Sequence, residues 1–368
     1  MRKQGAHDIG GCGVHTTNRK QSEYRELNDR ASVHGAYGHG AWAERPNYRN
    51  QGNHMLPNHI SIEKVILAEP RGFCAGVDRA VEAVRSALRD YGAPLYVRHQ
   101  IVHNRFVLEA LEREGAIFVE DLDEVPEGQR VIFSAHGVAP SEWDHARARR
   151  LRIMDATCPL VTKVHSEVER YTAEDRTVIL VGHAGHEEVK GTLGVAPGKV
   201  LLVGTVAEAE TLNLPDSNRV AAVTQTTLSV DDTSEIMATL KRRFPTIATP
   251  KTDDICYATQ NRQNAVKELV AVTDVVLVVG SKQSSNANRM VEVAQMRAGR
   301  AYLVDSLADV EPSMLAGVHA LGLTASASSP EWLVEEIVEA FASRGATVEL
   351  LKLKEERIHF PLPKSAEK

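Results

Sequence analysis

Residues 64–89, KVILAEPRGFCAGVDRAVEAVRSALR, contain the unit from which the fold is built. Residues 64–68 form a short, continuous apolar run, and a polar loop that carries Cys74 follows. Apolar residues then recur at helical spacing over residues 77–89. A continuous apolar run suits a strand that is buried on both faces. The stretch therefore predicts a buried strand, a loop with a thiol and an amphipathic helix.

The same alternation of apolar runs and amphipathic segments continues to about residue 343. Strands that alternate with helices indicate an α/β fold with mainly parallel sheets. The predicted strands are Lys64–Ala68, Leu95–Arg98, Val131–Ser134, Thr177–Val181, Lys199–Val203, Val220–Thr224, Asp274–Val279, Ala301–Val304 and Ala320–Thr324. The predicted helices are Val77–Arg89, Arg105–Glu114, Leu160–Thr172, Thr233–Phe244, Arg262–Ala271, Asn288–Ala298 and Glu331–Ser343.

Three cysteines, Cys74, Cys158 and Cys256, each lie where an apolar run gives way to a polar loop. Their even spread along the chain suggests one ligand from each of three structural units, converging on a shared metal centre. Three ligands would leave one metal position open for a substrate. Cys12 lies in a different kind of sequence and is excluded.

Other interpretations of the cysteines stay open at this point. A single buried cysteine usually packs as a small hydrophobe. Nothing marks the chain as secreted, which argues against disulfides. Structural zinc usually shows close cysteine pairs, and there are none here. Iron–sulfur clusters also often use clustered spacings, so the spacing alone does not select iron.

Polar residues follow at least six of the predicted strands, where ligands bind in parallel α/β sheets. Loops before helices attract phosphate through free backbone N–H groups. N-capping is the alternative for any one serine or asparagine. No Walker motif is present, and no GxGxxG follows a strand. The pattern predicts a phosphate or diphosphate pocket that includes His103, His136, Ser284, Ser285, Asn286 and Ser328.

Glu188 is the outstanding acid, in the glycine-flanked segment GHAGHEEVKGTLG at 182–194. A carboxylic acid in a dry pocket keeps its proton at neutral pH and delivers it to a substrate. Glu187 is its neighbour, and spacing alone does not choose between the two. A metal with an open position, a phosphate clamp and a proton donor suggest redox or Lewis-acid chemistry on a phosphorylated substrate.

Composition excludes several classes of function. The chain has 368 residues, a net charge of −6 and 25% charged residues, so it offers no general attraction for nucleic acid or anionic membranes. Its longest apolar runs are too short to span a bilayer. Neither a secretory signal nor a transit peptide is apparent, and a cytoplasmic location is expected. Residues 1–60 hold six histidines and almost no apolar periodicity, which predicts a disordered extension, with a metal-buffering histidine tract as the alternative.

Nine motifs from about residue 64 to 360 resemble the 4-hydroxy-3-methylbut-2-enyl diphosphate reductase family. The motifs are EPRGFCAGVDRA, VRHQIVHN, FSAHGV, DATCPLV, GHAGHEEVKGTLG, TQTTLSVDDTS, DDICYATQNRQ, VVGSKQSSNANR and TASASSPEWL. The resemblance implies three pseudo-symmetric α/β domains with mainly parallel sheets around a central iron–sulfur cluster. The expected divisions are a disordered extension at 1–60, domains at 61–158, 159–252 and 253–345, and a tail at 346–368.

The resemblance also implies the chemistry. A [4Fe–4S] cluster is expected on Cys74, Cys158 and Cys256, with one iron left free for the hydroxyl of an allylic diphosphate. Glu188 corresponds to the acid that relays protons. The remaining substrate contacts fall on His103, His136, His186, Thr226, Ser284, Ser285, Asn286 and Ser328. Gln283 differs from the family pattern and puts only details of its loop in doubt.

The expected reaction removes the hydroxyl as water and gives isopentenyl and dimethylallyl diphosphate, the last step of the non-mevalonate isoprenoid pathway. One-electron delivery suits an iron–sulfur centre, and the missing nicotinamide fingerprint favours ferredoxin or flavodoxin as the electron donor. No nucleic acid or membrane partner is expected. Two alternatives remain, a zinc-dependent hydrolase of a phosphorylated substrate and a non-enzymatic iron–sulfur sensor.

Overall fold

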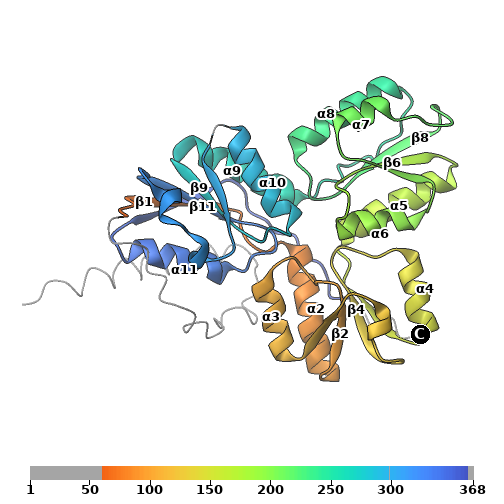
Figure 1. Cartoon of the computed structure of the whole chain (residues 1–368), viewed down its shortest axis with the longest axis horizontal. Helices are drawn as coiled ribbons and strands as arrows, with labels where there is room; N and C mark the ends of the chain where they lie inside the picture. Colours follow the sequence, from red (N-terminus) through yellow and green to blue (C-terminus); the bar gives the residue numbers. More distant parts are fainter. Residues whose placement is uncertain (1–59, 298, 364–368) are drawn as a thin grey trace, which may run out of the picture.

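The computed structural model describes residues 60–297 and 299–363, and in it three lobes surround a common centre (Figure 1). Each lobe contains one sheet, and every pairing between its strands is parallel. The predicted α/β class with parallel sheets is confirmed. The predicted extension at 1–60 lies almost entirely outside the described residues, as does Cys12.

Lobe 1 has the strand order β3-β2-β4-β5. Asn104 caps one of its helices by accepting hydrogen bonds from the N–H groups of Phe106 and Val107, at 3.1 and 3.3 Å. This cap fixes the loop that carries His103. The elements are α2 (Ala75–Tyr91), β2 (Leu95–Arg98), α3 (Arg105–Glu114), β3 (Ala116–Val119), η1 (Leu122–Glu124), β4 (Arg130–Phe133), α4 (Pro140–Ala148) and β5 (Arg152–Asp155).

Lobe 2 has the strand order β7-β6-β8. The chain runs from β6 outward to β7 and then returns to the other side of β6, so the carboxyl ends of β6 and β8 flank the point where the strand order reverses. Ligands bind at such points in parallel sheets. The elements are α5 (Pro159–Ala173), β6 (Thr177–Val181), α6 (Glu187–Val195), β7 (Val200–Val203), α7 (Val206–Thr211), β8 (Val220–Thr224) and α8 (Val230–Arg243).

Lobe 3 has the strand order β10-β9-β11-β1-β12 and holds the largest core. Leu333, Ile337 and Phe341 of its last helix are almost fully buried, and each such side chain contributes about 1.5–3 kcal/mol. The elements are β1 (Lys64–Glu69), α9 (Tyr257–Val272), β9 (Val275–Val279), α10 (Ser285–Met296), β10 (Ala301–Val304), η2 (Leu307–Asp309), η3 (Pro312–Leu315), β11 (Ala320–Ala325), α11 (Glu331–Ala342) and β12 (Thr347–Lys352).

The strand pairing differs from the predicted domain division in two places. Strand β1 was expected to belong with residues 61–158, but it pairs with β11 and β12 in lobe 3 (Figure 1, red-orange among blue). The expected tail at 346–368 contains β12, which lies at the edge of the same sheet. The sheet therefore joins strands about 280 residues apart, and local patterns do not specify such partners.

Within the described part of the chain, no helix combines the length and the apolar character needed to cross a bilayer.

Candidate active site

The three predicted metal ligands occupy equivalent positions. Cys74, Cys158 and Cys256 are the N-cap residues of α2, α5 and α9. Each also lies where the chain passes between lobes. Cys74 follows β1 of lobe 3 and precedes α2, which packs on lobe 1. Cys158 follows β5 of lobe 1 and precedes α5, which packs on lobe 2. Cys256 follows lobe 2 and precedes α9, which packs on lobe 3. The thiols therefore lie at the three junctions between lobes, where the lobes meet.

Gly76 shows how closely two of these thiols approach. A Cβ atom at Gly76 would lie 2.7 Å from Sγ of Cys158 and 3.8 Å from Sγ of Cys74. Any larger residue would therefore displace a thiol. Burial raises the pKa of Cys74 to about 11 and that of Cys158 to about 12. Burial also raises the pKa of Cys256. Free thiols at these positions stay protonated at neutral pH, and a bound cationic metal would replace the protons.

The spacing of the thiols does not suit a single zinc ion. Tetrahedral zinc with Zn–S bonds of about 2.3 Å requires sulfur atoms about 3.8 Å apart. Across residues 60–297 and 299–363, the three thiols are not among the groups whose ligand atoms all lie within 4.8 Å of one another. A cluster of several irons spans a wider triangle of thiolates than one ion does. Three thiols that are not all within this distance could hold a cluster of several irons.

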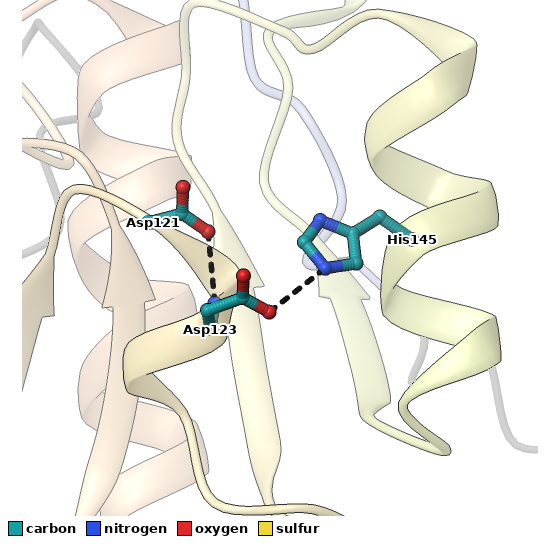
Figure 2. A group of neighbouring side chains, drawn as sticks. All are labelled: Asp121, Asp123 and His145. Atoms are coloured by element: carbon teal, nitrogen blue, oxygen red, sulfur yellow. Dashed lines mark hydrogen bonds and ion pairs between the residues drawn. The ribbon is translucent and has the colours of Figure 1, made fainter.

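Asp121, Asp123 and His145 do lie within 4.8 Å of one another, on the surface of lobe 1 (Figure 2). Their contacts explain this grouping without a metal ion. Asp121 caps η1, with the N–H of Asp123 2.9 Å from its carboxylate. The Asp123 carboxylate lies 3.1 Å from Nε2 of His145 and 2.9 Å from Arg149. The group is an ion-pair network with two exposed carboxylates, and we assign it no catalytic role.

Three histidines from different loops meet close to one another. The ring centroids of His103 and His136 are 4.3 Å apart and stacked, and the ring of His186 lies edge-on to both, at 5.6 and 5.7 Å. Burial, and then the charges of His103 and His186, hold the pKa of His136 well below its usual value. Burial is also the main cause of the lowered pKa of His103. It likewise lowers the pKa of His186, to about 4. A cluster of buried, neutral imidazoles is suited to accept protons when an anion binds.

The predicted hydroxyl and amide groups lie next to these histidines. The Ser328 hydroxyl donates to the backbone oxygen of His103 at 3.2 Å and lies 3.5 Å from the hydroxyl of Ser284. The Asn286 side chain accepts a hydrogen bond from the N–H of Ala327 at 3.0 Å. Ser284 is also the N-cap of α10, so the capping interpretation and the anion-site interpretation both apply to it. Two loops of lobe 3 thus bond to each other, and one of them contacts the loop that carries His103 in lobe 1.

Glu188 lies in the first turn of α6, and its carboxylate is buried, at 3% exposure. Thr226 holds both carboxylate oxygens, with its N–H at 2.7 Å and its hydroxyl at 2.9 Å. Burial raises the pKa of Glu188 to about 7, although both hydrogen bonds oppose the shift. Glu187 instead faces His99 and Lys190, at 3.0 and 2.7 Å. The geometry therefore distinguishes the two glutamates that spacing could not.

Three residues that were not among the predicted site residues connect the groups of the site. They are Thr259, Thr227 and Gln225. The Thr259 hydroxyl lies 3.2 Å from Sγ of Cys256 and 3.5 Å from the amide of Asn286. The Thr227 hydroxyl donates to Ser285 at 3.0 Å and accepts from Gln225, also at 3.0 Å. The Cys256–Thr259 spacing is that of an N-cap and the third residue of its helix, a signal that was present in the sequence.

His183, which also follows a strand, is not part of this cluster. It lines a separate cavity of about 240 Å³ in lobe 2, together with Ser229, Asp232 and, from lobe 3, Arg289. Two of its polar side chains have other partners, since Arg289 bonds Glu292 and Ser229 caps α8 by accepting from the N–H of Asp232. The residues that converge are therefore those of the thiol junctions, the three histidines, the two serine loops and Glu188.

The fold and this cluster define a class of protein with three parallel-sheet lobes and three thiols at their junctions, together with three neighbouring histidines and a buried carboxyl group of raised pKa. The model of the family described as LytB protein matches residues 65–342. The chain belongs to the LytB protein family.

Named relatives extend the comparison. A 4-hydroxy-3-methylbut-2-enyl diphosphate reductase of Azoarcus sp. (strain BH72) is 54% identical over 302 residues, which is 82% of this chain and 97% of that protein. A protein of the same name from Mycobacterium leprae (strain TN) is 54% identical over 311 residues, 84% of this chain and 94% of that protein.

A solved structure of E-1-hydroxy-2-methyl-but-2-enyl-4-diphosphate reductase from Plasmodium falciparum is 40% identical and covers 82% of this chain and 96% of its own, with a TM-score of 0.79. A second, of (E)-4-hydroxy-3-methyl-but-2-enyl diphosphate reductase, is described as the terminal enzyme of the non-mevalonate pathway. It is 31% identical, with a TM-score of 0.55, and covers 76% of this chain and 99% of its own.

Proposed function

We propose that the chain catalyses the reductive removal of the hydroxyl group of 4-hydroxy-3-methylbut-2-enyl diphosphate. Two electrons and two protons are consumed, the C–O bond breaks, and the products are water with isopentenyl or dimethylallyl diphosphate. The observation that carries the proposal is the convergence of three junction thiols, three histidines and a buried carboxyl group of raised pKa at one place. The names of relatives more than 50% identical over most of the chain support it.

The diphosphate is proposed to lie against the three histidines and the serine loops of lobe 3. Imidazoles with depressed pKa values take up protons as the anion approaches, and they then donate charge-assisted hydrogen bonds. Ser284, Asn286 and Ser328 add neutral donors from a second direction. Because these groups come from all three lobes, a ligand that contacts them all is enclosed.

Cys74, Cys158 and Cys256 would hold a [4Fe–4S] cluster with no fourth protein ligand. When bound, such a cluster would supply electrons one at a time and an iron with an open coordination position. The chain's own contribution at this point is burial, because an enclosed centre at the lobe junctions is kept from bulk water.

Glu188 is proposed to supply protons to the departing hydroxyl and to the allylic carbon skeleton. With a pKa raised to about 7, the carboxyl group carries its proton about half of the time at neutral pH, and this match between pKa and working pH favours general acid catalysis. Thr226, which holds both oxygens of Glu188, positions the acid. We propose that its hydroxyl also contacts the substrate.

The electrons are proposed to come from a small one-electron carrier protein, such as ferredoxin or flavodoxin. The sequence contains no nicotinamide fingerprint of the GxGxxG type after a strand. The protein is expected to work in a reducing compartment such as the cytoplasm, because its buried thiols must stay reduced.

The proposal is tested by measuring iron, sulfide and zinc per chain after anaerobic purification, followed by turnover of the allylic diphosphate with a one-electron chemical reductant. About four iron and four sulfide per chain, with formation of both products, is the expected result. Zinc without sulfide would instead support a hydrolase. Iron and sulfide without turnover of the allylic diphosphate would move the sensor hypothesis forward.

A further inference from the structure

The chain beyond β12 crosses from lobe 3 to lobe 1 as an irregular segment, residues 353–363, which we call the C-terminal strap. Its first residue, Leu353, donates a backbone hydrogen bond to Glu69 at 3.0 Å. Glu356 is buried, with its side chain 4% exposed. Further along, the backbone oxygen of Pro361 accepts from Arg79 of α2 at 2.8 Å. The strap is thus attached at its start to the last residue of β1 and near its other end to α2, the helix whose N-cap is Cys74.

Arg262 connects the strap to the backbone in front of Cys74. Its side chain is fully buried and pairs with Glu356 at 3.1 Å, and Asn261 also donates to Glu356, at 2.9 Å. The other nitrogens of Arg262 donate to the backbone oxygens of Gly72, at 2.6 and 3.1 Å, and Phe73, at 3.2 Å. These carbonyl groups immediately precede Cys74, so Arg262 fixes the approach of the chain to that thiol.

The same helix also holds the backbone behind Cys74. The hydroxyl of Tyr257 accepts a hydrogen bond from the N–H of Ala75, at 3.3 Å. Tyr257 and Arg262 both belong to α9, the helix that Cys256 begins. The position of Cys74 relative to Cys256 is therefore set by contacts on both sides of Cys74.

Arg79 plays the equivalent part for Cys158. Its guanidinium donates to the backbone oxygen of Thr157 at 2.9 Å and to that of Asp155 at 3.4 Å, while its Nε reaches Pro361 of the strap. Thr157 is the residue immediately before Cys158. Two arginines thus each join one cysteine loop to the strap.

We propose that the C-terminal strap is a structural part of the thiol centre, because it anchors Arg262 and Arg79, which position Cys74 and Cys158 for a bound cluster. The inference rests on the proposed function. Arg262 is a positioning residue that also places a buried positive charge near the centre, and Glu356 partly neutralises that charge. A buried ion pair that loses one partner leaves an uncompensated charge, so the two residues act as a unit.

Truncation tests the positioning role. A chain that ends at Lys354 lacks most of the strap but keeps β12, and the matched control ends at Pro363. After anaerobic reconstitution, we expect the strap truncation to lose most of its iron and sulfide and to bleach faster in air, while its far-UV circular dichroism matches the control. Equal iron, sulfide and bleaching rates would overturn the inference. A full-length chain that binds no iron would overturn the proposed function itself, and the inference with it.

A point substitution tests the charge without removing the strap. Glu356→Gln keeps the shape and an acceptor for Asn261 but removes one negative charge from beside Arg262. We expect full iron content and a reduction midpoint that shifts to more positive values, measured by a redox titration followed by electron paramagnetic resonance. The control is Glu355→Gln, since Glu355 pairs with Arg357 at the surface, and its midpoint should not move. An unshifted midpoint for Glu356→Gln would contradict the role of the Arg262–Glu356 pair.

Discussion

Replacing Glu188 by glutamine separates the proton supply from every other property of the site. The amide has the shape of the carboxyl group, and its oxygen still accepts the hydrogen bond that the N–H of Thr226 donates at 2.7 Å. Substrate affinity and iron content should therefore stay at the wild-type level. The variant has no acidic proton, and the loss of a positioned general acid costs about 10²–10⁴-fold in turnover.

The raised pKa of Glu188 also gives this variant a stability signature. The pKa rises from 4.5 to about 7 on folding, and each pKa unit corresponds to about 1.4 kcal/mol. The native state keeps the proton while the unfolded chain releases it near pH 4.5. Stability of the wild-type chain therefore falls as the pH rises from 4.5 to 7, by about 3 kcal/mol in total. Glutamine does not titrate, so this loss is absent from the variant.

Two assays check these expectations. Single-turnover kinetics with the allylic diphosphate should show the loss in rate with an unchanged dissociation constant. Thermal melting should show that the melting temperature of the variant rises relative to that of the wild type between pH 5 and pH 8. Glu187→Gln is the matched control, because that carboxylate faces His99 and Lys190, and its turnover should stay close to wild type. Wild-type turnover in Glu188→Gln would refute the reasoning.

Four other expectations follow from the same geometry. Gly76→Ala should lose most bound iron, because its Cβ would lie 2.7 Å from Sγ of Cys158; full iron content would contradict the convergence of the thiols. Cys158→Ser should likewise lose iron and sulfide, and retention of both would exclude it as a ligand. Binding of inorganic diphosphate should take up protons and weaken as the pH rises, because burial lowers the pKa of His136 and His186 in the free protein. Calorimetry in two buffers that differ in ionisation enthalpy measures the proton uptake. Binding without proton uptake would argue against the histidine site. Deleting residues 1–54 should leave turnover intact, since every site residue lies beyond them, and an inactive but folded truncation would disprove this.

Much of the secondary structure was predictable because buried parallel strands produce continuous apolar runs. All nine predicted strands are present. The strands that were missed, β3, β5 and β12, are short or have exposed residues, such as Ile117 and Arg152. Helix α6 was missed because Gly191 and Gly194 weaken its helical pattern. Those glycines serve tertiary packing, since a Cβ at Gly194 would lie 2.3 Å from that of Ala139 in lobe 1.

The chemistry-bearing residues of the site were easier to predict than the residues that support them. Thiols and histidines at strand ends are conspicuous, whereas Arg262 in an amphipathic helix resembles a surface residue. Only the fold shows that its side chain is fully buried against Gly72 and Glu356. The strands that pair with β1 could not be predicted either, because an apolar run specifies burial but not which strand lies beside it.

The placement of the thiols at helix N-caps has a physical consequence for what they bind. Three helix N-termini and the Arg262 guanidinium present positive potential to the centre, and the charge of Arg262 lowers the pKa of Cys74 and Cys256. Burial outweighs these contributions and keeps the free thiols neutral. A bound metal would change the balance, because its positive charge would replace the protons and the surrounding dipoles would stabilise the thiolates that hold it. The same arrangement therefore disfavours reactive free thiolates and favours a metal-bound centre, and it ties the relative placement of the three lobes to that centre.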